Sequence, residues 1–345
     1  MTAEKDFGNE RRITSSGCTD VLHICANGGM QVSFDRKALY EIAYQYYELE
    51  HTQQEIAKSL GISRSQVSRA LRQAREAGIV LLKVIDPDLD CSDLARALKE
   101  RFGLEDTVVI AGIDSPRLLA QSLGCAAARY LASCVREQSV VGVSWGATLR
   151  EVAAALGAMK PSSLNVTVVP LLGGLGQVAA DLQINELAIR VARALGGSNL
   201  YLHAPSFVDT PEAKAAIMAD SNIKKVVELW QQVDVALVGV GTFRPPSTLL
   251  ERGGFPDSEL AELRRIGAVG DMCMRFFNIN GATVETALND RIVGVTLDEL
   301  GRMKRVMAVA GGANKTEAIL GALRSKAVDV MITDDAAARG VMSLA

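Results

Sequence analysis

The stretch Thr52-Gln-Gln-Glu-Ile-Ala-Lys-Ser-Leu-Gly-Ile-Ser-Arg-Ser-Gln-Val-Ser-Arg-Ala-Leu71 predicts two short helices joined by a tight turn. Glycine takes the left-handed conformation that ends a helix at no steric cost, and Gly61 stands at that point. Ser63 follows where an N-cap hydroxyl accepts from the first free amides of the next helix. The apolar residues recur at helical spacing on both sides of the turn: Ile56, Ala57 and Leu60, then Val67, Ala70 and Leu71.

The polar face of the second predicted helix carries side chains that hydrogen-bond to DNA bases or phosphates. This pattern is typical of a helix-turn-helix, in which the second helix enters the major groove. We expect most of the base contacts to come from Arg64, Gln66, Ser68 and Arg69. Arg72 and Lys83 are expected to contact phosphates. The predicted DNA-binding set is Thr52, Gln53, Ser63, Arg64, Ser65, Gln66, Ser68, Arg69 and Arg72.

An ordinary helical hairpin with a solvated polar face is the alternative. The charge distribution weighs against it, because residues 63–83 hold five basic side chains and one acidic side chain. The whole chain, by contrast, has a net charge of −3. Positive charge is therefore concentrated on the predicted reading helix, which favours a local contact with nucleic acid.

The length of 345 residues predicts two domains. Hydrophobic residues make up 48% of the chain and aromatic residues 5%, a composition that suits an α/β domain with buried parallel strands. The predicted architecture is an N-terminal all-α, winged helix-turn-helix domain followed by a Rossmann-like parallel-sheet domain. We place its segments at 1–33 (a disordered or variable extension), 34–86 (DNA-binding), 87–104 (a linker helix) and 105–345 (effector-binding).

Around the quoted stretch, a leading helix is predicted over 34–49 and the two helices of the motif over 52–60 and 64–77. Residues 78–85 resemble a short strand, which we interpret as a wing. Residues 89–102 predict an amphipathic helix. It is either a linker that pairs subunits or a core helix of the second domain.

From residue 106 onward, strand and helix patterns alternate, which predicts a parallel sheet with right-handed crossovers. The predicted strands are Thr107–Ala111, Ser139–Ser144, Asn165–Leu172, Asn199–His203, Val235–Val240, Val306–Ala310 and Asp329–Thr333. The predicted helices lie near 115–135, 147–158, 181–195, 221–232 and 314–325. Ligands of such sheets bind beyond the carboxyl ends of the strands.

Four loops of small residues follow predicted strands, at 142–149, 171–177, 239–244 and 310–315. Small residues let the backbone approach a ligand, and the amides of a following helix suit a phosphate or the oxygens of a polyol. The predicted effector-binding set is Ser144, Gly146, Thr148, Gly173, Gly174, Gln177, Gly241, Thr242, Asp271, Arg275 and Lys315.

Three of these assignments have a plain structural alternative. The loop at 142–149 also suits tight packing of a helix on a strand, and Lys315 also suits a solvated helix end. Asp271 and Arg275 either hold a hydroxyl and an anion, respectively, or pair with each other and brace their loop.

The remaining composition argues against several classes. The six cysteines show no C-x-x-C spacing and are expected to be reduced, in the cytoplasm. Cys18, His23 and Cys25 make only a weak zinc pattern, so no metal is predicted. The glycine loops lack both the dinucleotide fingerprint and the P-loop lysine, and no cofactor is predicted. No apolar run reaches the roughly 18 residues of a membrane span.

The motifs together resemble the SorC-type bacterial transcriptional regulators. The helix-turn-helix is followed in order by Gly-Val-Ser-Trp-Gly-Ala-Thr-Leu (142–149), Gly-Asp-Met-Cys-Met-Arg-Phe-Phe (270–277) and Ala-Val-Ala-Gly-Gly-Ala-Asn-Lys (308–315), and then by the last strand pattern at 328–335. The similarity spans about residues 36–340. Met272 and Met274 depart from the smaller residues of many relatives.

The resemblance implies a sugar-binding domain related to sugar-phosphate isomerases and deaminases, in a tetramer or dimer of dimers. It also implies a sugar or polyol effector, in phosphorylated form. By matching motifs, it implies that Ser144, Gly146 and Thr148 lie at the phosphate end, that Lys315 contributes to the pocket and that Asp271 lies on the hydroxyl side.

These observations predict a repressor or activator of a carbohydrate or polyol catabolic operon, with operator DNA and a small effector as partners. One alternative is a phosphosugar isomerase or deaminase with an added DNA-binding domain. Asp271 and the Asp334–Asp335 pair would be its candidate bases, and Lys315 a Schiff-base candidate. Another is a regulator that needs no ligand.

Overall fold

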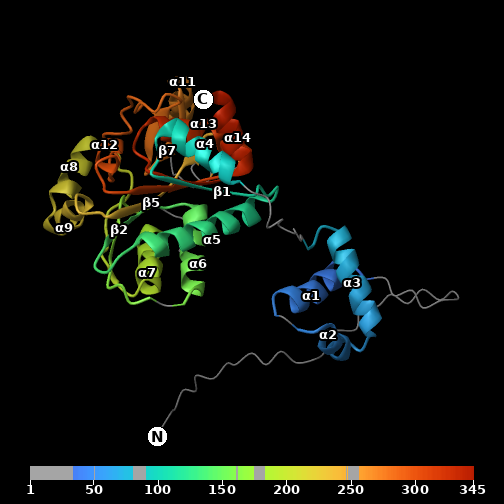
Figure 1. Cartoon of the computed structure of the whole chain (residues 1–345). Helices are drawn as coiled ribbons and strands as arrows, with labels where there is room; N and C mark the ends of the chain where they lie inside the picture. Colours follow the sequence, from blue (N-terminus) through green and yellow to red (C-terminus); the bar gives the residue numbers. More distant parts are fainter. Residues whose placement is uncertain are drawn as a thin grey trace, which may run out of the picture. The chain divides into compact units, whose positions relative to one another are not determined.

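A computed structural model describes residues 34–49, 51–80, 91–160, 162–174, 183–245, 247 and 256–345 (Figure 1). The chain divides into two compact units, Met1–Asp86 and Pro87–Ala345. No described helix combines the length and hydropathy that a bilayer crossing requires.

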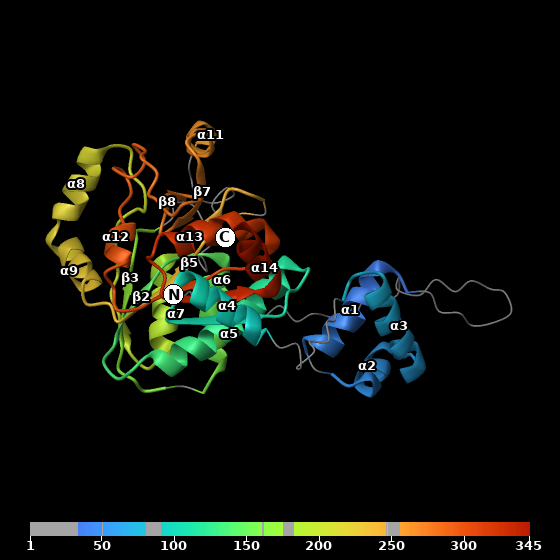
Figure 2. The same ribbon diagram turned by 45° about the horizontal axis from the view of Figure 1, so that its top comes forward.

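Three helices make up the described part of the first unit: α1 (Arg36–Tyr47), α2 (Gln53–Leu60) and α3 (Arg64–Glu76) (Figure 2). These ranges confirm the three predicted helices to within about two residues at each end. The helices share one apolar core, which consists of Leu39, Ile42, Ala43, Ile56, Ala57, Val67, Ala70, Leu71 and Ala74. Each helix contributes one buried stripe, as the spacing of apolar residues predicts.

The predicted wing is described only at its start. Residues 78–80 form a turn and a bend there rather than a strand, and residues 81–85 lie outside the described part of the chain. Beyond them, α4 (Ser92–Phe102) begins inside the predicted 89–102 helix. Leu98 and Phe102 of α4 are buried in the core of the second unit. Of the two interpretations of this segment, the core helix is therefore the one that the packing supports.

The second unit is built on a seven-stranded sheet in the order β1-β10-β9-β5-β2-β3-β4, and every neighbouring pair is parallel. Six of the seven predicted strands are present, within about two residues at each end. The fourth prediction, Asn199–His203, was wrong over most of its length, because β4 has two residues and shares only Asn199 with it. Their bounds are β1 Asp106–Ile110, β2 Val140–Val143, β3 Thr167–Pro170, β4 Ser198–Asn199, β5 Val235–Gly239, β9 Val306–Val309 and β10 Val330–Asp334. The strand order reverses between β2 and β5, which is where open parallel sheets bind ligands.

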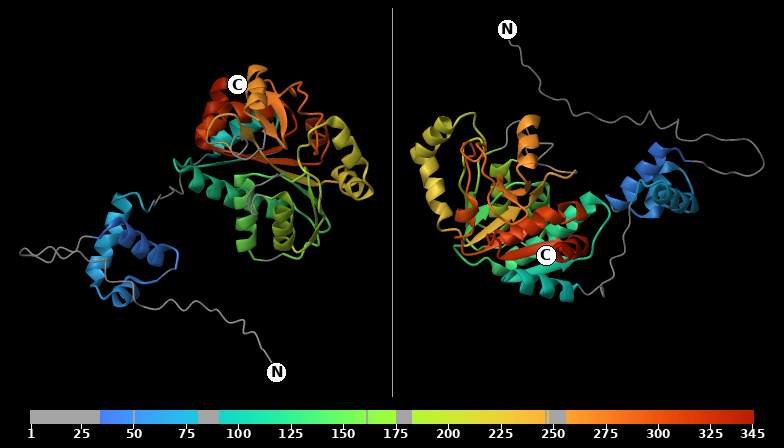
Figure 3. Two further views of the ribbon diagram at one scale, coloured as in Figure 1. Left: turned by 180° about the vertical axis from the view of Figure 1, so that it is seen from behind. Right: turned by 90° about the horizontal axis from the view of Figure 1, so that it is seen from above.

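Helices cover both faces of this sheet (Figures 1 and 3). One face carries α5 (Pro116–Cys134), α6 (Ala147–Ala158) and α7 (Ile184–Ala194). The other carries α4, α9 (Ser221–Trp230), α13 (Thr316–Arg324) and α14 (Asp335–Leu344). Strand β5 is apolar throughout because its successive side chains enter the two cores in turn, with Leu237 on the α6 side and Val238 on the α13 side.

A second, three-stranded antiparallel sheet was not predicted. It contains β6 (Gly241–Thr242), β7 (Ala268–Met272) and β8 (Arg275–Asn278). The stretch around Asp271, expected as a loop, is therefore a hairpin. Its two turn residues, Cys273 and Met274, have φ angles of 52° and 61°, the left-handed conformation that two-residue hairpins require. Smaller elements complete the unit: α8 Pro211–Ala219, α11 Asp257–Arg265, α12 Leu297–Leu300 and the 3₁₀ helix η2 Ala313–Lys315.

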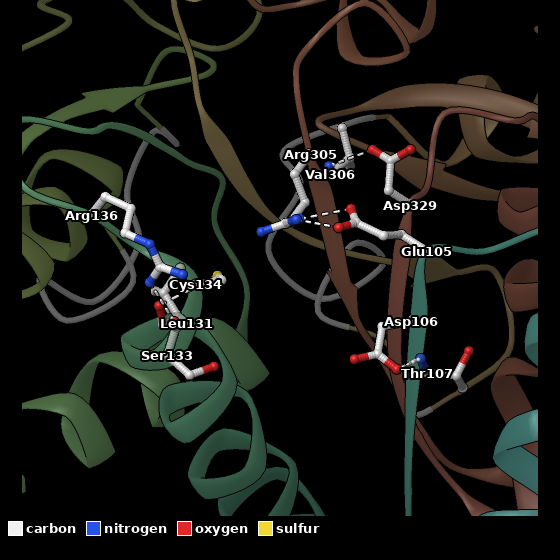
Figure 4. Close-up of polar contacts among 10 residues, drawn as sticks. All are labelled: Glu105, Asp106, Thr107, Leu131, Ser133, Cys134, Arg136, Arg305, Val306 and Asp329. Atoms are coloured by element: carbon white, nitrogen blue, oxygen red, sulfur yellow. Dashed lines mark hydrogen bonds and ion pairs between the residues drawn. The ribbon is translucent and has the colours of Figure 1, made fainter.

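A polar cluster holds the amino ends of β1, β9 and β10 together (Figure 4). The Arg305 guanidinium donates to both carboxylate oxygens of Glu105, with Nε 2.7 Å from Oε2. The Asp329 carboxylate accepts from the backbone amide of Val306 at 2.7 Å. Each of the three charged residues directly precedes its strand, so the cluster braces the end of the sheet opposite to the carboxyl edge.

Candidate functional site

The turn between α2 and α3 has the geometry that the sequence predicts. Gly61 is left-handed at φ 65°, and its amide donates to the carbonyl of Ala57. Both helices begin with a capping box. In the first, the Glu55 amide donates to Thr52 Oγ1 at 3.3 Å and the Thr52 amide donates to Glu55 Oε2 at 2.8 Å.

The second capping box fixes the start of α3. The Gln66 amide donates to Ser63 Oγ at 3.2 Å, and the Ser63 amide donates to Gln66 Oε1 at 2.7 Å. Ser63 Oγ also lies 2.9 Å from Ser65 Oγ. The side-chain oxygen of Gln66, Oε1, is therefore already hydrogen-bonded. Its side-chain nitrogen, Nε2, is the group that can donate to a base.

Most of the remaining predicted DNA-binding residues lie on the solvent-exposed face of α3. Val67, Ala70, Leu71 and Ala74 are buried, so the other face is turned to solvent. That face carries Arg64, Ser65, Ser68, Arg69 and Arg72, all of them exposed. Thr52 is exposed and Gln53 half-buried at the start of α2, and Lys83 lies outside the described residues.

In the second unit, a cavity of about 460 Å³ lies beyond the carboxyl ends of the strands. The segments after β2, β5, β9, β10 and β1 line it, so it spans the point at which the strand order reverses. Seven of the predicted effector-binding residues line this cavity, namely Ser144, Gly146, Thr148, Gly241, Thr242, Asp271 and Lys315.

On one wall, the amino end of α6 faces the cavity. Gly146 is its N-cap, with φ 146°, and no side chain caps the helix. The free amides of the first turn and the Thr148 hydroxyl are consequently placed where a phosphate or sugar oxygen would accept from them. Ser144, almost fully buried, lies just before them.

Opposite charges meet at Lys315 and Asp271. Lys315 Nζ donates to the Val240 carbonyl at 2.7 Å, and burial lowers the pKa of this lysine. Asp271 Oδ2 accepts from the Met274 amide at 3.1 Å, whereas Oδ1 is buried without a hydrogen-bond partner. Burial raises the pKa of Asp271 to about 6, against the opposing effect of the Met274 amide and of the Lys315 charge. A buried acceptor without a partner is costly, and a ligand hydroxyl would satisfy it.

Gly241 makes this arrangement possible. A Cβ atom at that position would lie 1.8 Å from Asp271 Oδ1. Thr242 has a structural role beside it, because its hydroxyl donates to the Asn314 carbonyl at 3.4 Å and accepts from the Arg244 amide at 3.1 Å. The hydroxyl of Thr242 thus ties the β5–β6 segment to the loop that presents Lys315.

The other predicted residues are placed elsewhere. Gly173 and Gly174 follow β3, on the far side of β2, and their amides donate to the carbonyls of Val293 and Ala204. Neither glycine is among the described residues that line the cavity. Gln177 lies outside the described residues.

Arg275 does not line the cavity either. Its nearly buried guanidinium donates to the backbone carbonyls of Asn289, Ile292, Gly294 and Val295 at 2.7 to 3.3 Å. It braces the 289–295 loop, and it neither pairs with Asp271 nor faces the ligand space. Sequence reasoning recognised the charge but not the four carbonyls that converge on it from a distant loop.

The β1 and β10 side of the cavity contains residues outside the predicted effector-binding set. Gly112 and Asp114 follow β1, and Asp334 ends β10. Asp334 Oδ1 accepts from the Gly312 amide at 2.7 Å, and Asp335 Oδ1 accepts from the Gly112 amide at 2.6 Å. The consecutive carboxylates Asp334 and Asp335 at the end of a predicted strand could have indicated this side of the cavity, but the sequence suggested them only as candidate catalytic bases.

Within the described part of the chain, no group of His, Cys, Asp or Glu side chains is arranged to hold a metal ion. Cys18, His23 and Cys25 lie outside it.

Two family models match the chain. The sugar-binding domain family matches residues 86–343, and the Crp-like helix-turn-helix domain matches residues 36–90. Among curated proteins, the deoxyribonucleoside regulator of Bacillus subtilis is 36% identical over 305 residues, with 88% of this chain and 96% of that protein covered. The sorbitol operon regulator of Klebsiella pneumoniae is 29% identical, with 88% and 97% covered.

Solved structures agree with these matches. The crystal structure of the full-length sorbitol operon regulator SorC from Klebsiella pneumoniae superimposes with a TM-score of 0.68 at 29% identity, and the alignment covers 89% of this chain and 98% of that one. A DeoR family transcriptional regulator from Listeria monocytogenes has a TM-score of 0.65 at 31% identity over 72% of this chain and 98% of its own. The chain therefore belongs to the SorC-type family of transcriptional regulators, with a helix-turn-helix DNA-binding unit followed by a sugar-binding unit.

Proposed function

We propose that this protein controls a carbohydrate or polyol catabolic operon, and that a small effector in the cavity of the second unit changes its affinity for operator DNA. The relatives named for sorbitol and deoxyribonucleosides, and the erythritol catabolism regulatory protein EryD of Brucella abortus, support the class of operon. The observation that carries the proposal is the cavity at the switch point. Its lining includes Asp271, whose Oδ1 is buried without a hydrogen-bond partner, and Lys315.

The cavity supports a definite set of effector contacts. The amides at the start of α6, with Ser144 and Thr148, bind the phosphate or terminal oxygens of the effector. Asp271 Oδ1 accepts from an effector hydroxyl, and Lys315 neutralises or donates to an effector oxygen. Gly146 and Gly241 leave the space for these contacts.

On the DNA, the exposed face of α3 lies in the major groove. Arg64, Ser68 and Arg69 read bases together with the Gln66 amide nitrogen, and Arg72 contacts a phosphate. A dimer places two such helices on half-sites about one helical turn, or a multiple of it, apart. We extend this to a tetrameric assembly of the chain, with residues 34–86 as DNA-binding unit and 105–345 as effector unit, acting as a repressor in the cytoplasm, where operator DNA lies. Helix α4, within the segment 87–104, is part of the core of the effector unit.

A regulatory role fits the cavity better than catalysis. The carboxylates of Asp334 and Asp335 accept from glycine amides, which makes them braces for two loops rather than available bases. Asp271 is held by the amide of a strained turn next to Lys315. Proton shuttling between sugar carbons needs a base within reach of the carbon-bound proton, and Asp271 is the one remaining candidate of those that the sequence analysis weighed.

The test combines a thermal-shift panel with operator binding. An effector at one hundred times its Kd stabilises the fold by about 2.7 kcal/mol, so sugars, polyols and their phosphates are screened for a rise in the melting temperature. Hits are then added to the protein on DNA from its own promoter region. A hit that changes operator affinity supports the proposal, and enzymatic conversion of a hit refutes it. A complete panel without any stabilisation indicates a ligand-independent regulator.

A further inference from the structure

The cavity extends beyond the cluster of Lys315, Asp271 and Ser144. Its other end lies between the segment after β1 and the first two turns of α5. The walls there are aliphatic side chains, namely Ile113, Pro116, Leu119, Ala120 and Leu123. One cavity of about 460 Å³ thus has a polar end and an apolar end. That volume falls within the range of roughly 300–1,000 Å³ of sites that take drug-sized ligands, which are larger than a single sugar.

Two glycines let the loops at the apolar end pack closely against neighbouring side chains. A Cβ atom on Gly311 would lie 2.8 Å from Leu123 Cδ1 and 2.7 Å from Asp334 Oδ1. One on Gly112 would lie 2.6 Å from Asp335 Oδ1. The backbone of both loops therefore packs directly against the leucine and carboxylate side chains.

The charges of the cavity are divided between its two ends. Its charged lining residues, among those that the structure describes, are Asp114, Asp271, Asp334 and Lys315. The lysine lies at the polar end, where it donates to the Val240 carbonyl. Asp114, which follows β1, and Asp334, the last residue of β10, lie at the α5 end. A phosphate is repelled there, whereas a group with N–H donors and apolar ring faces finds both acceptors and aliphatic walls.

We propose that the α5 end of the cavity is a subsite for a nucleobase, so that the effector is a nucleoside whose sugar lies at the Lys315 and Asp271 end. The inference rests on the proposed sensor function and narrows its ligand class. A purine or pyrimidine with an exocyclic amino group has apolar faces for Ile113, Pro116 and Ala120 and N–H donors for the carboxylates at that end. A purely alkyl substituent would fill the same space but would make no hydrogen bond to the carboxylate of Asp114 or Asp334.

The first experiment measures Kd by isothermal titration for the full-length protein. The ligands are 2-deoxyribose, its 5-phosphate, deoxyadenosine, deoxycytidine and the alkyl glycoside methyl 2-deoxyriboside. The amino-bearing nucleosides are expected to bind at least tenfold more tightly than deoxyribose and than the methyl riboside. Nucleosides that bind no better than the free sugar would overturn the proposal, and so would a methyl riboside that equals them.

The second experiment fills the subsite. Ala120 is half-buried on the cavity side of α5, and Ala120→Phe places a ring in the space assigned to the base. This variant is expected to lose at least tenfold in nucleoside affinity and to keep its affinity for deoxyribose or its phosphate. Cys125→Phe adds the same ring at an exposed position of α5 outside the cavity lining; it is the matched control and retains both affinities. Equal losses for sugar and nucleoside in Ala120→Phe would contradict a separate subsite.

A variant at a loop position guards against misfolding of Ala120→Phe. Ile113→Ser removes one half-buried wall residue from the segment after β1, and it is expected to weaken nucleoside binding three- to thirtyfold without changing sugar binding. The failures are distinguishable. If sugars or their phosphates bind and release operator DNA but nucleosides do not, the subsite is refuted and the sensor function stands. If nothing binds in this panel or in the thermal-shift panel of sugars, polyols and their phosphates, the proposed sensor function itself fails, and the subsite with it.

Discussion

The two units of this protein place their functional side chains in opposite ways. In the first, the DNA-binding candidates follow one another within 52–72 and are exposed on the surface of two short helices. In the second, Ser144, Thr242, Asp271 and Lys315 come from four different segments and are wholly or partly buried around one cavity. A surface site built within one motif tolerates the loss of a side chain, whereas a buried site depends on the packing of every segment that meets there.

The largest expected effect sharpens this contrast at Gly241. Gly241→Val forces a Cβ atom into Asp271 Oδ1, so we expect at least a hundredfold loss of effector affinity, with operator binding by the first unit retained. Titration calorimetry measures the effector affinity, and an operator-binding assay without effector measures the retained DNA binding. Gly239→Ala is the control, because its Cβ would meet its nearest atom, the Trp145 carbonyl oxygen, at an ordinary 3.6 Å. Normal effector binding by Gly241→Val would show that Asp271 does not need its present position.

The next prediction concerns the pH dependence of stability, and it compares the buried carboxyl group of Asp271 with the exposed one of Asp114. The pKa of Asp271 is about 6 in the fold, above its usual 3.8, so the native state binds more protons than the unfolded chain between those values. Stability in the absence of effector should therefore fall as pH rises from about 4 to 6, by up to about 3 kcal/mol at 1.36 kcal/mol per pKa unit.

Asp271→Asn keeps an acceptor for the Met274 amide and removes the charge, so its melting temperature should lack that component of the pH dependence. Asp114→Asn, at an exposed carboxylate of the same cavity, is the matched control. Identical pH profiles for the wild type and Asp271→Asn would mean that burial does not perturb this carboxyl group.

On the DNA side, the expected loss is smaller and leaves the fold intact. Arg69→Ala should weaken specific operator binding by about 1–3 kcal/mol, the usual contribution of one base contact. Arg75→Ala removes the same charge from the last turn of α3 and should lower affinity for all duplexes alike. Competition between operator and unrelated DNA checks both variants. Equal affinity of Arg69→Ala and wild type for the operator would remove Arg69 from the base-reading set.

The smallest effect concerns the cap that orients the reading helix. Ser63→Ala removes the acceptor of the Gln66 amide and should destabilise α3 locally by about 1 kcal/mol. Hydrogen exchange of the α3 amides should then be about fivefold faster, and operator binding modestly weaker. Ser68→Ala, at an exposed position without a capping role, should leave exchange unchanged. Faster exchange in both variants would show that the cap is not the cause.

Much of the fold was predictable because the signals are local. The alternation of apolar strands and amphipathic helices predicted six of the seven parallel strands, and Gly61 with Ser63 predicted the turn before α3. Three of the four glycine loops meet at one cavity for the same reason, since parallel strands bring their carboxyl ends to one edge. The hairpin around Asp271 escaped prediction, because Cys273 and Met274 occupy turn positions at which glycine or asparagine is the usual signal.

By itself the sequence determined the helix-turn-helix, the parallel sheet and the family, because periodicity, capping residues and motif order act over a few residues at a time. Only the tertiary structure decided that Gly173 and Arg275 lie away from the cavity, that Asp334 lines it and that Asp271 keeps an unsatisfied oxygen. These outcomes depend on strand order and on contacts between segments far apart in the chain. Burial, which sets the pKa of Asp271 and Lys315, exists only once those segments have packed together.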